Sequence, residues 1–524
     1  MRIMKTMTLF VASALLIGVT ACDVTTEPKS TVTEANVFND TQSYEAFLAK
    51  LYAGLSVTGQ QGPNGNSDFS RLDEGFSHYG RQLWQLQELP TDEAVLGWGD
   101  AGIPEMITMG WASSNQFVQM MYSRVFYQVS LVNEFLRATS DDALAERGHS
   151  NLRDEIAPMR AEARFLRAFS YWHGIDLWGN IPLVKEDFEL GATAPEQSDR
   201  ATIYQFVVDE LNDIRNDLPA VGAAEYGRVD QGTVAMLLAK LYLNAGVYIG
   251  ADQASLALSE VAQVIGGPYS LATNYQLNFL ADNQNSPEII WAVAQDGDRT
   301  QQWGGLTFLI HAAVGGNMNA GDYGIDGGWW GIRVLPELVA QFPGGAASLD
   351  GRALFFTDGQ RLEVDNISDF AAGYAGSKFK NVTSLGVAGS HPTYPDTDFP
   401  VFRLADAYLM YAEAHLRGGG GDATTAVGYV NELLERAYGD QSANITAGEL
   451  TLDFILGERA RELWWEGHRR TDLIRFGQFT TGDYLWSWKG GSQAGVAVAD
   501  RFNLYPLPAS ELLANPNLTQ NPGY

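Results

Sequence analysis

Residues 160–172 read RAEARFLRAFSYW, and residues 176–184 continue the stretch as DLWGNIPLV. Three arginines and three bulky aromatic residues repeat here at helical spacing: Arg160, Arg164, Arg167, Phe165, Phe169 and Trp172. Side chains three or four positions apart are neighbours on one helix surface. Charges this close to large rings predict partly buried, mutually paired residues that join the helix to its neighbours. We therefore interpret this stretch as scaffold and not as a ligand site.

Helical periodicity also occupies most of the remaining chain. We expect helices over residues 43–56, 113–137, 155–176, 202–218, 229–248, 255–265, 403–416, 424–435 and 452–476. Alanines punctuate the paired helices, for example Ala235 and Ala239 in one and Ala405 and Ala412 in another. Such small residues let helices approach closely, as in tetratricopeptide-like hairpins. The sequence therefore predicts a mainly α fold built on a helix-turn-helix scaffold.

Between Gly266 and Pro400 this periodicity fades, apart from residues 330–341, and glycine, asparagine, aspartate and tryptophan become frequent. Residues 59–66 and 96–110 have a similar texture. Long irregular segments in a helical protein are usually binding loops or disordered chain. Their aromatic content favours order, so we interpret them as binding loops.

Five tryptophans lie in or beside these glycine-rich segments: Trp84, Trp98, Trp303, Trp329 and Trp330. Sugars present apolar C–H faces that pack on aromatic rings, while their hydroxyls need polar partners. Asp68, Asp73 and Arg81 precede Trp98 and are suited to supply such hydrogen bonds. The alternative interpretation is that the tryptophans fill a core covered by loops.

Motifs for catalysis or cofactors are nearly absent. Gly97–Gly102 fits the dinucleotide glycine pattern, but no βαβ unit surrounds it. Asp322–Gly327 half-resembles a calcium loop, but Arg333 stands where the closing glutamate belongs. The seven histidines show no metal-ligand spacing, so we expect no metal and no cofactor. A glycoside hydrolase stays open, since neighbouring acids cannot show whether two carboxylates oppose each other across a cleft.

Charge and hydropathy exclude further classes. The chain carries 63 acidic and 34 basic residues, and its formal charge of −29 argues against binding nucleic acid. No apolar run after Val19 approaches the length of a membrane helix. The 45% hydrophobic content is sufficient for a large core.

The N-terminus reads as an export signal. A basic start with Arg2 and Lys5 precedes a small and apolar stretch over residues 8–19. Val19-Thr20-Ala21-Cys22 resembles a bacterial lipobox, and Cys22 is the one cysteine among 524 residues. We therefore predict a signal peptide at 1–21 and a diacylated Cys22 that opens a polar tether over 22–33.

Three more motifs follow along the chain. They are FRLADAYLMYAEA at 402–414, ERAREL with EGHRRTDL within 458–473, and the ending YPLP at 505–508 with QNPGY at 520–524. Together with residues 160–184, they resemble the SusD/RagB outer-membrane lipoproteins of Bacteroidota, in the same order. Within the motif of residues 458–473, Glu466 and Arg470 are spaced to pair along one helix.

The resemblance implies a single SusD-like domain over 34–524, with an N-terminal part at about 34–225 and a C-terminal part at about 266–524. It implies four tetratricopeptide-like hairpins as scaffold and irregular loops as ligand surface. The implied activity is non-catalytic capture of glycans at the cell surface for a SusC-like TonB-dependent transporter of the outer membrane. Peptide capture of the RagB type is the alternative.

The resemblance also ranks the candidate ligand residues. The segment from Asp73 to Trp98 is similar to a family region that often lines the ligand site, so Asp73, Arg81 and Trp98 are our first candidates. Trp303, Trp329 and Trp330 are the second, because they are aromatic residues of the predicted binding loops.

Overall fold

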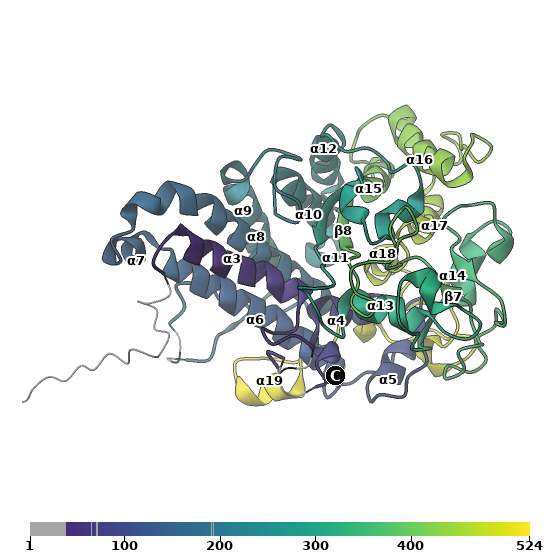
Figure 1. Cartoon of the computed structure of the whole chain (residues 1–524), viewed down its shortest axis with the longest axis horizontal. Coiled ribbons are helices and arrows are strands. Elements are labelled where there is room, and N and C mark those ends of the chain that lie inside the picture. The colour runs from purple at the N-terminus through teal and green to yellow at the C-terminus, as the bar shows by residue number, and fades with distance from the viewer. Residues whose placement is uncertain (1–37, 64, 66, 70–71, 190, 192) are drawn as a thin grey trace, which may run out of the picture.

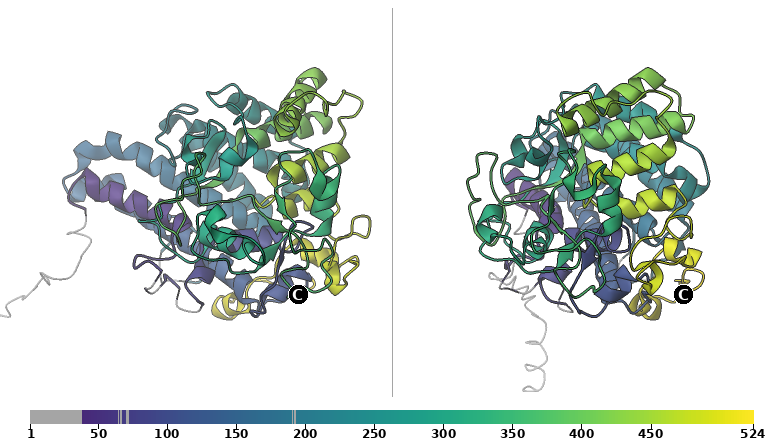
Figure 2. Two further views of the ribbon diagram at one scale, coloured as in Figure 1. Left: turned by 45° about the vertical axis from the view of Figure 1, so that its right-hand side comes forward. Right: turned by 90° about the vertical axis from the view of Figure 1, so that its right-hand side faces the viewer.

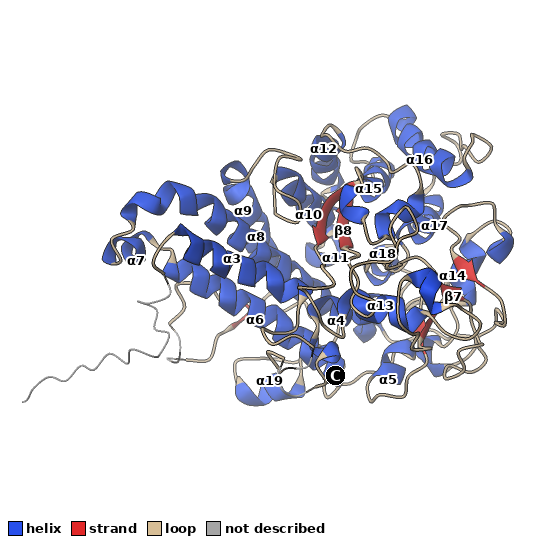
Figure 3. Ribbon diagram, viewed as in Figure 1, coloured by secondary structure: helices blue, strands red, loops and turns tan. Residues whose placement is uncertain are grey.

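The computed structural model describes residues 38–524 apart from positions 64, 66, 70, 71, 190 and 192. The predicted signal peptide, Cys22 and the tether lie outside the described residues. Helices dominate the described chain (Figures 1 and 3). Within it, no helix combines the length and the apolar composition that crossing a bilayer requires.

The first group of helices precedes the irregular middle of the chain. It comprises α3 Thr41–Ser56, α4 Tyr79–Glu88, α5 Ile103–Ile107, α6 Gln116–Ala138, α7 Asp141–Glu146, α8 Arg153–Leu177, α9 Arg200–Ile214, α10 Gln231–Leu243, α11 Ala245–Ile249 and α12 Ala254–Ile265. The second group comprises α13 Gly305–Ala313, α14 Pro336–Gln341, α15 Leu404–Leu416, α16 Ala423–Tyr438, α17 Leu452–Leu463, α18 Arg469–Arg475 and α19 Ala509–Ala514.

Consecutive long helices pack as neighbours along the scaffold. α6 packs on α8, α8 on α9, α10 on α12, α12 on α15, and α15 on α16, while α3 covers α6 and α8 (Figure 1). Nearly every side chain of α10 is buried, which is the pattern of a helix surrounded by others. The prediction of a mainly α fold from paired helices is confirmed.

Strands in the described chain form four antiparallel two-stranded pairs. They are β1 Val95–Leu96 with β5 Ile332–Arg333, β2 Ile181–Pro182 with β3 Gln197–Ser198, β4 Ile289–Val293 with β8 Phe399–Arg403, and β6 Phe355–Phe356 with β7 Ala375–Gly376. The pair of β1 with β5 ties the segment between α12 and α15 to chain outside it, whereas β4 and β8 pair within that segment. Figure 2 shows that segment gathered on one side of the packed helices.

Some helix boundaries differ from those expected. The predicted helix 229–248 is divided at Asn244 into α10 and α11, and its last turn closes on Gly250 at a φ of 68°. The α-helix expected over 202–218 ends at Ile214 and continues as a single 3₁₀ turn. Residues 330–341 are helical only in α14, because the segment before it pairs as β5.

The largest correction concerns residues 452–476, which form two helices instead of one. Trp465 and Gly467 adopt left-handed backbone angles, with φ of 62° and 82°, and this separates α17 from α18. The predicted pairing of Glu466 with Arg470 is therefore wrong. Glu466 accepts hydrogen bonds from Arg403 and Lys378, whereas Arg470 binds Asp176 at 3.0 Å.

The scaffold role predicted for the arginines of residues 160–172 is confirmed. Arg164 and Arg167 both bind Glu210 of α9, at 2.6 and 2.7 Å. Arg160 donates to the carbonyl of Leu136 and to the hydroxyl of Thr139, beside the end of α6. These side chains join α8 to the helices on both sides.

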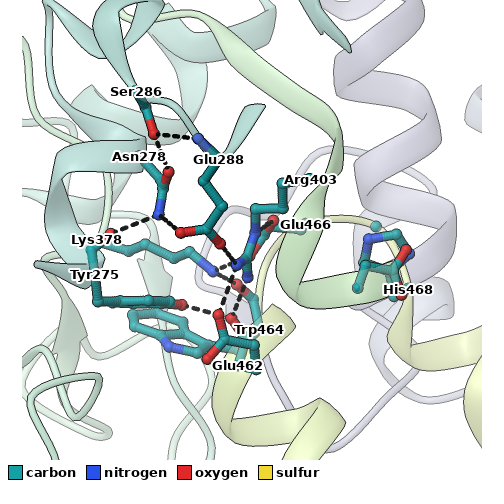
Figure 4. A network of polar contacts seen from close by, with 12 residues as sticks. Tyr275, Asn278, Ser286, Glu288, Lys378, Arg403, Glu462, Trp464, Glu466 and His468 are labelled. Carbon is teal, nitrogen blue, oxygen red and sulfur yellow. Dashed lines mark hydrogen bonds and ion pairs between the residues drawn. The ribbon is translucent and has the colours of Figure 1, made fainter. Parts of the chain in front are cut away.

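Arg403, from the motif at residues 402–414, is the centre of a buried ion network (Figure 4). Its guanidinium, 1% exposed, binds the carboxylates of Glu288, Glu462 and Glu466 at 2.6–2.7 Å. Burial acts to raise the pKa of Glu462, but the neighbouring guanidinium groups, led by that of Arg436, hold it well below its usual range. The network therefore joins the start of β4 and the end of α17 to Arg403, the last residue of β8.

Two buried carboxylates hold the turn between α17 and α18 against α4. Glu88 accepts the backbone N–H groups of Gly467 and His468, at 2.6 and 3.2 Å, and Glu93 accepts that of Trp465 at 2.9 Å. Burial raises the pKa of Glu88 to about 7 and raises the pKa of Glu93 as well.

This pair makes stability depend on pH. The folded-state pKa of Glu88 lies above the ordinary value of 4.5, so the folded chain binds this proton more tightly than the unfolded chain. Its contribution to stability therefore falls as pH rises from about 4.5 to about 7. We expect a higher melting temperature at pH 6 than at pH 8, and a smaller difference in Glu88→Gln. Glu146→Gln, at an exposed position of α7, is the control, and an unchanged difference in Glu88→Gln would contradict this explanation.

Candidate functional site

Aromatic rings from widely separated segments meet on the loop-rich side of the molecule. Trp98 follows β1, Trp303 precedes α13 and Trp329 precedes β5. The ring of Trp329 lies 6.3 Å from that of Trp98 and 6.1 Å from that of Trp303, between centroids. Tyr394 continues the series at 5.2 Å from Trp303. We call Trp98, Trp329, Trp303 and Tyr394 the aromatic row.

Backbone pairing places Trp98 beside Trp329. The register of β1 and β5 sets Leu96 opposite Ile332, and the Gly97 N–H donates to the Gly331 carbonyl at 2.9 Å. The Trp98 indole N–H donates to the carbonyl of Trp329 at 3.3 Å. A Cβ at Gly331 would lie 2.7 Å from the Trp98 ring, so only glycine leaves room for this ring.

His311 supports the middle of the row. Its imidazole is buried and stacks on the Trp329 ring, with centroids 4.6 Å apart and planes 23° apart. Its two ring nitrogens lie 2.6 and 2.8 Å from the carbonyl oxygens of Gly327 and Thr393. One side chain therefore positions the loops that carry Trp329 and Tyr394.

Glu74 fixes the position of Trp303. Its carboxylate accepts the Trp303 backbone N–H at 2.9 Å and the Thr58 hydroxyl. Burial raises the pKa of Glu74 against the opposing effect of these hydrogen bonds. Both oxygens of this carboxylate are thus engaged in holding the loop, so its contacts are those of a structural group.

Arg81, a first candidate, lies beneath the row and not on its surface. Its guanidinium is 4% exposed and sits between the rings of Phe76 and Phe308, 4.1 and 4.0 Å from their centroids. It also lies 5.7 Å from the Trp98 ring. Burial lowers the pKa of Arg81 to about 9, although nearby carboxylates, led by Asp73, act to raise it. The structure thus makes Arg81 a support for Trp98 through cation–π contact.

The other candidate residues lie at the margins of the aromatic row. Asp73 is exposed and accepts the Gly75 backbone N–H at 3.2 Å. Trp330, 56% exposed, packs on Phe370 with centroids 5.9 Å apart, outside the row. The structure therefore brings Trp98, Trp303 and Trp329 together, with Asp73 and Arg81 beside them and Trp330 at the periphery.

Tyr394, a residue of the row, and His311, which supports it, were not among the candidates selected from the sequence. Tyr394 lies in the segment SHPTYPDTDFP at 390–400, and its backbone N–H donates to the His391 imidazole at 3.2 Å. An aromatic residue in an irregular segment was the signal used for the tryptophans, and it applies equally to this tyrosine. The position of His311 inside a helix gave no such signal.

The protein is thus a helical protein of the class in which paired helices form the scaffold and irregular loops present an aromatic surface. Residues 348–524 match the sequence model of the SusD family. Starch-binding protein SusD of Bacteroides thetaiotaomicron is 37% identical over 528 residues, which is 92% of each chain. The chain belongs to the SusD family, and the resemblance identified from its motifs is confirmed.

Solved structures agree on the fold. A SusD superfamily protein of Bacteroides vulgatus matches with a TM-score of 0.71 at 20% identity, covering 93% of this chain and 100% of that one. Surface glycan-binding protein A of Bacteroides thetaiotaomicron, in complex with laminarihexaose, matches with a TM-score of 0.67 at 20% identity, covering 92% and 99%. At this identity the likeness concerns the fold alone.

Proposed function

We propose that this protein binds neutral glucan chains of the starch type at the aromatic row without cleaving them. The observation that carries the proposal is the row itself, since the partly exposed rings of Trp98, Trp329 and Trp303 offer successive apolar platforms to a chain of sugars. Tyr394, which is 7% exposed, supports the end of the row at Trp303. The chain that is 37% identical is named a starch-binding protein, which supports a glucan as the ligand.

The geometry of the row favours a chain that turns. Successive ring planes are tilted by 42° between Trp98 and Trp329, 47° between Trp329 and Trp303, and 59° between Trp303 and Tyr394. Coplanar rings would match a flat, extended glycan, whereas tilted rings follow a curved one. A helical α-1,4-linked glucan therefore fits this surface better than a straight β-1,4-linked chain.

The wider role extends this binding to uptake. The protein acts at the cell surface, held to the outer membrane through a lipidated Cys22, and passes the glycan to a SusC-like TonB-dependent transporter. Membership of the SusD family supports this role, as does the family's implied position at the outer membrane. Asp73 and Trp330 extend the ligand surface at the margins of the row.

Calorimetric titration of the purified protein with malto-oligosaccharides, laminarin and short peptides tests the binding. We expect binding of the α-glucan and no release of new reducing ends. Binding of peptides alone would favour the RagB-like alternative, and released reducing sugar would indicate a hydrolase. Co-purification of an outer-membrane receptor with the tagged wild-type protein, lost in Cys22→Ala, tests the transport role.

A glycine beneath Trp303 gives a sharper test of the row. A Cβ at Gly75 would lie 2.5 Å from the Trp303 carbonyl oxygen and 2.7 Å from its Cβ, so Gly75→Ala must displace the Trp303 segment. We expect a loss of about 1–3 kcal/mol of stability from this overpacking, together with weaker glucan binding by calorimetry. Gly99→Ala is the matched control, because a Cβ at Gly99 meets nothing within 4 Å. Equal affinities in the two variants would argue against Trp303 as a ligand platform.

A further inference from the structure

Tyr226 is an exposed aromatic side chain that is held rigidly. It is 42% exposed, yet its hydroxyl donates to the Asp398 carboxylate at 2.6 Å. Asp398 is buried and fixed in turn, since its other oxygen accepts the Gln295 backbone N–H at 2.6 Å. Asn283 also bonds the backbone of Asp398 on both sides, at 2.9 and 3.0 Å. A ring anchored in this way loses little side-chain freedom when a ligand packs on it.

Two open hollows meet at this ring. The first, about 520 Å³, lies between α3, the turn at residues 225–228 and the end of β4. The second, about 410 Å³, is lined by Gln284, Gln295, Asp296, Asp298 and Asp396 together with Tyr226. Tyr226 and Ala294 line both hollows. The exposed ring therefore stands between two spaces that are open to a ligand.

The chemistry of the second hollow selects an uncharged ligand. Its lining combines carboxylates and side-chain amides with one aromatic ring, and no lysine or arginine is among its described lining residues. Carboxylate and amide groups accept and donate hydrogen bonds to sugar hydroxyls, whereas a sulfated or uronate-bearing glycan would be repelled. Burial, opposed by hydrogen bonds, raises the pKa of Asp398 to about 6, so the anchoring carboxylate is ionised at neutral pH.

Two loops link this ring to the aromatic row. Ser390 and Asp396 of the second hollow flank Tyr394 in one loop, and the other loop runs from Ala294 to Trp303. The Gly297 N–H donates to Asp396 at 2.8 Å, which joins the two loops. The same two loops therefore carry residues of the row and residues that line the second hollow.

We propose that Tyr226 is the stacking platform of a second binding site for neutral glycans, which engages polymers in addition to the aromatic row. The inference rests on the proposed function, because it takes the row to be the primary glucan site. Two linked sites bind a polymer more tightly than either site alone, whereas a short oligosaccharide occupies one site at a time.

The test measures binding of a soluble α-glucan polymer and of a short malto-oligosaccharide to the intact protein. We expect Tyr226→Ala to weaken polymer binding by about tenfold and to leave the affinity of the row for the oligosaccharide unchanged. Trp329→Ala should weaken oligosaccharide binding at the row by about 30- to 100-fold while leaving residual polymer binding, which the double variant loses. Leu256→Ala, with a similarly exposed apolar side chain on α12, is the matched control.

The outcomes separate this inference from the proposed function. Unchanged polymer affinity in Tyr226→Ala, alongside a loss in Trp329→Ala, would overturn the second site and leave the primary site intact. Absence of glucan binding by the wild-type protein would instead overturn the proposed function. Tyr226→Phe keeps the ring and removes its bond to Asp398, so retained polymer binding in this variant, with loss in Tyr226→Ala, supports stacking. Equal losses of polymer binding and of melting temperature in both variants would overturn it.

Discussion

Trp329→Ala is expected to lower the affinity for an α-glucan by about 30- to 100-fold, which corresponds to about 2–3 kcal/mol. The reason is its central position, with Trp98 and Trp303 about equally distant on either side at 6.3 and 6.1 Å. Removing the ring interrupts the platform, whereas removing an end ring only shortens it. Calorimetric titration of wild-type and variant with the same oligosaccharide measures the effect.

Trp330→Ala is the control for this variant. The two tryptophans are adjacent in the chain, but Trp330 packs on Phe370 outside the row. We therefore expect a much smaller loss of affinity for Trp330→Ala than for Trp329→Ala. Equal losses would show that the ligand surface is centred elsewhere than on the row.

Arg403→Ala is expected to destabilise the fold by about 3–5 kcal/mol, because it leaves buried carboxylates without their counter-ion. Glu288, Glu462 and Glu466 are almost completely buried, and each binds Arg403 within 2.7 Å. Chemical denaturation followed by fluorescence measures the free energy of unfolding. The free energy of unfolding of Arg403→Lys should fall between those of the wild type and Arg403→Ala, since an ammonium keeps the charge but cannot replace the forked contacts of a guanidinium.

Arg361→Ala provides the matched control for the buried network. Arg361 also contacts two carboxylates, Asp365 and Asp369, but its side chain is 38% exposed. Water already screens such a pair, so we expect little change in the free energy of unfolding. A similar loss in Arg361→Ala and Arg403→Ala would show that burial is not the cause of the effect.

Local patterns predicted the helices well because helical hydrogen bonds and side-chain spacing are short-range. The expected segments 43–56 and 155–176 correspond to α3 and α8 within a few residues. The break between α17 and α18 was not predicted, because Trp465 adopts a left-handed conformation that its residue type disfavours. Bonds from Glu88 and Glu93, more than 370 positions away in the chain, hold that turn.

The candidate site was predicted in part. Trp98, Trp303 and Trp329 were selected because they are aromatic residues in irregular segments, and the structure brings these three together. The same criterion did not separate Trp330 from them. It also gave no indication that Arg81 is enclosed between Phe76 and Phe308. Burial of a side chain in a loop depends on which distant segments cover it, and a local pattern carries no such information.

The sequence by itself determined the helical scaffold, the family and the segments that supply the candidate ligand residues, because periodicity and motifs are properties of neighbouring residues. Only the tertiary structure decided which rings form the row and which lie outside it. Pairing of β1 with β5 and the bridge made by His311 bring together residues as far apart in the chain as Trp98 and Trp329, which are separated by 231 positions. Contacts over such separations arise from packing of the whole chain, so the shape of the ligand surface is a property of the fold.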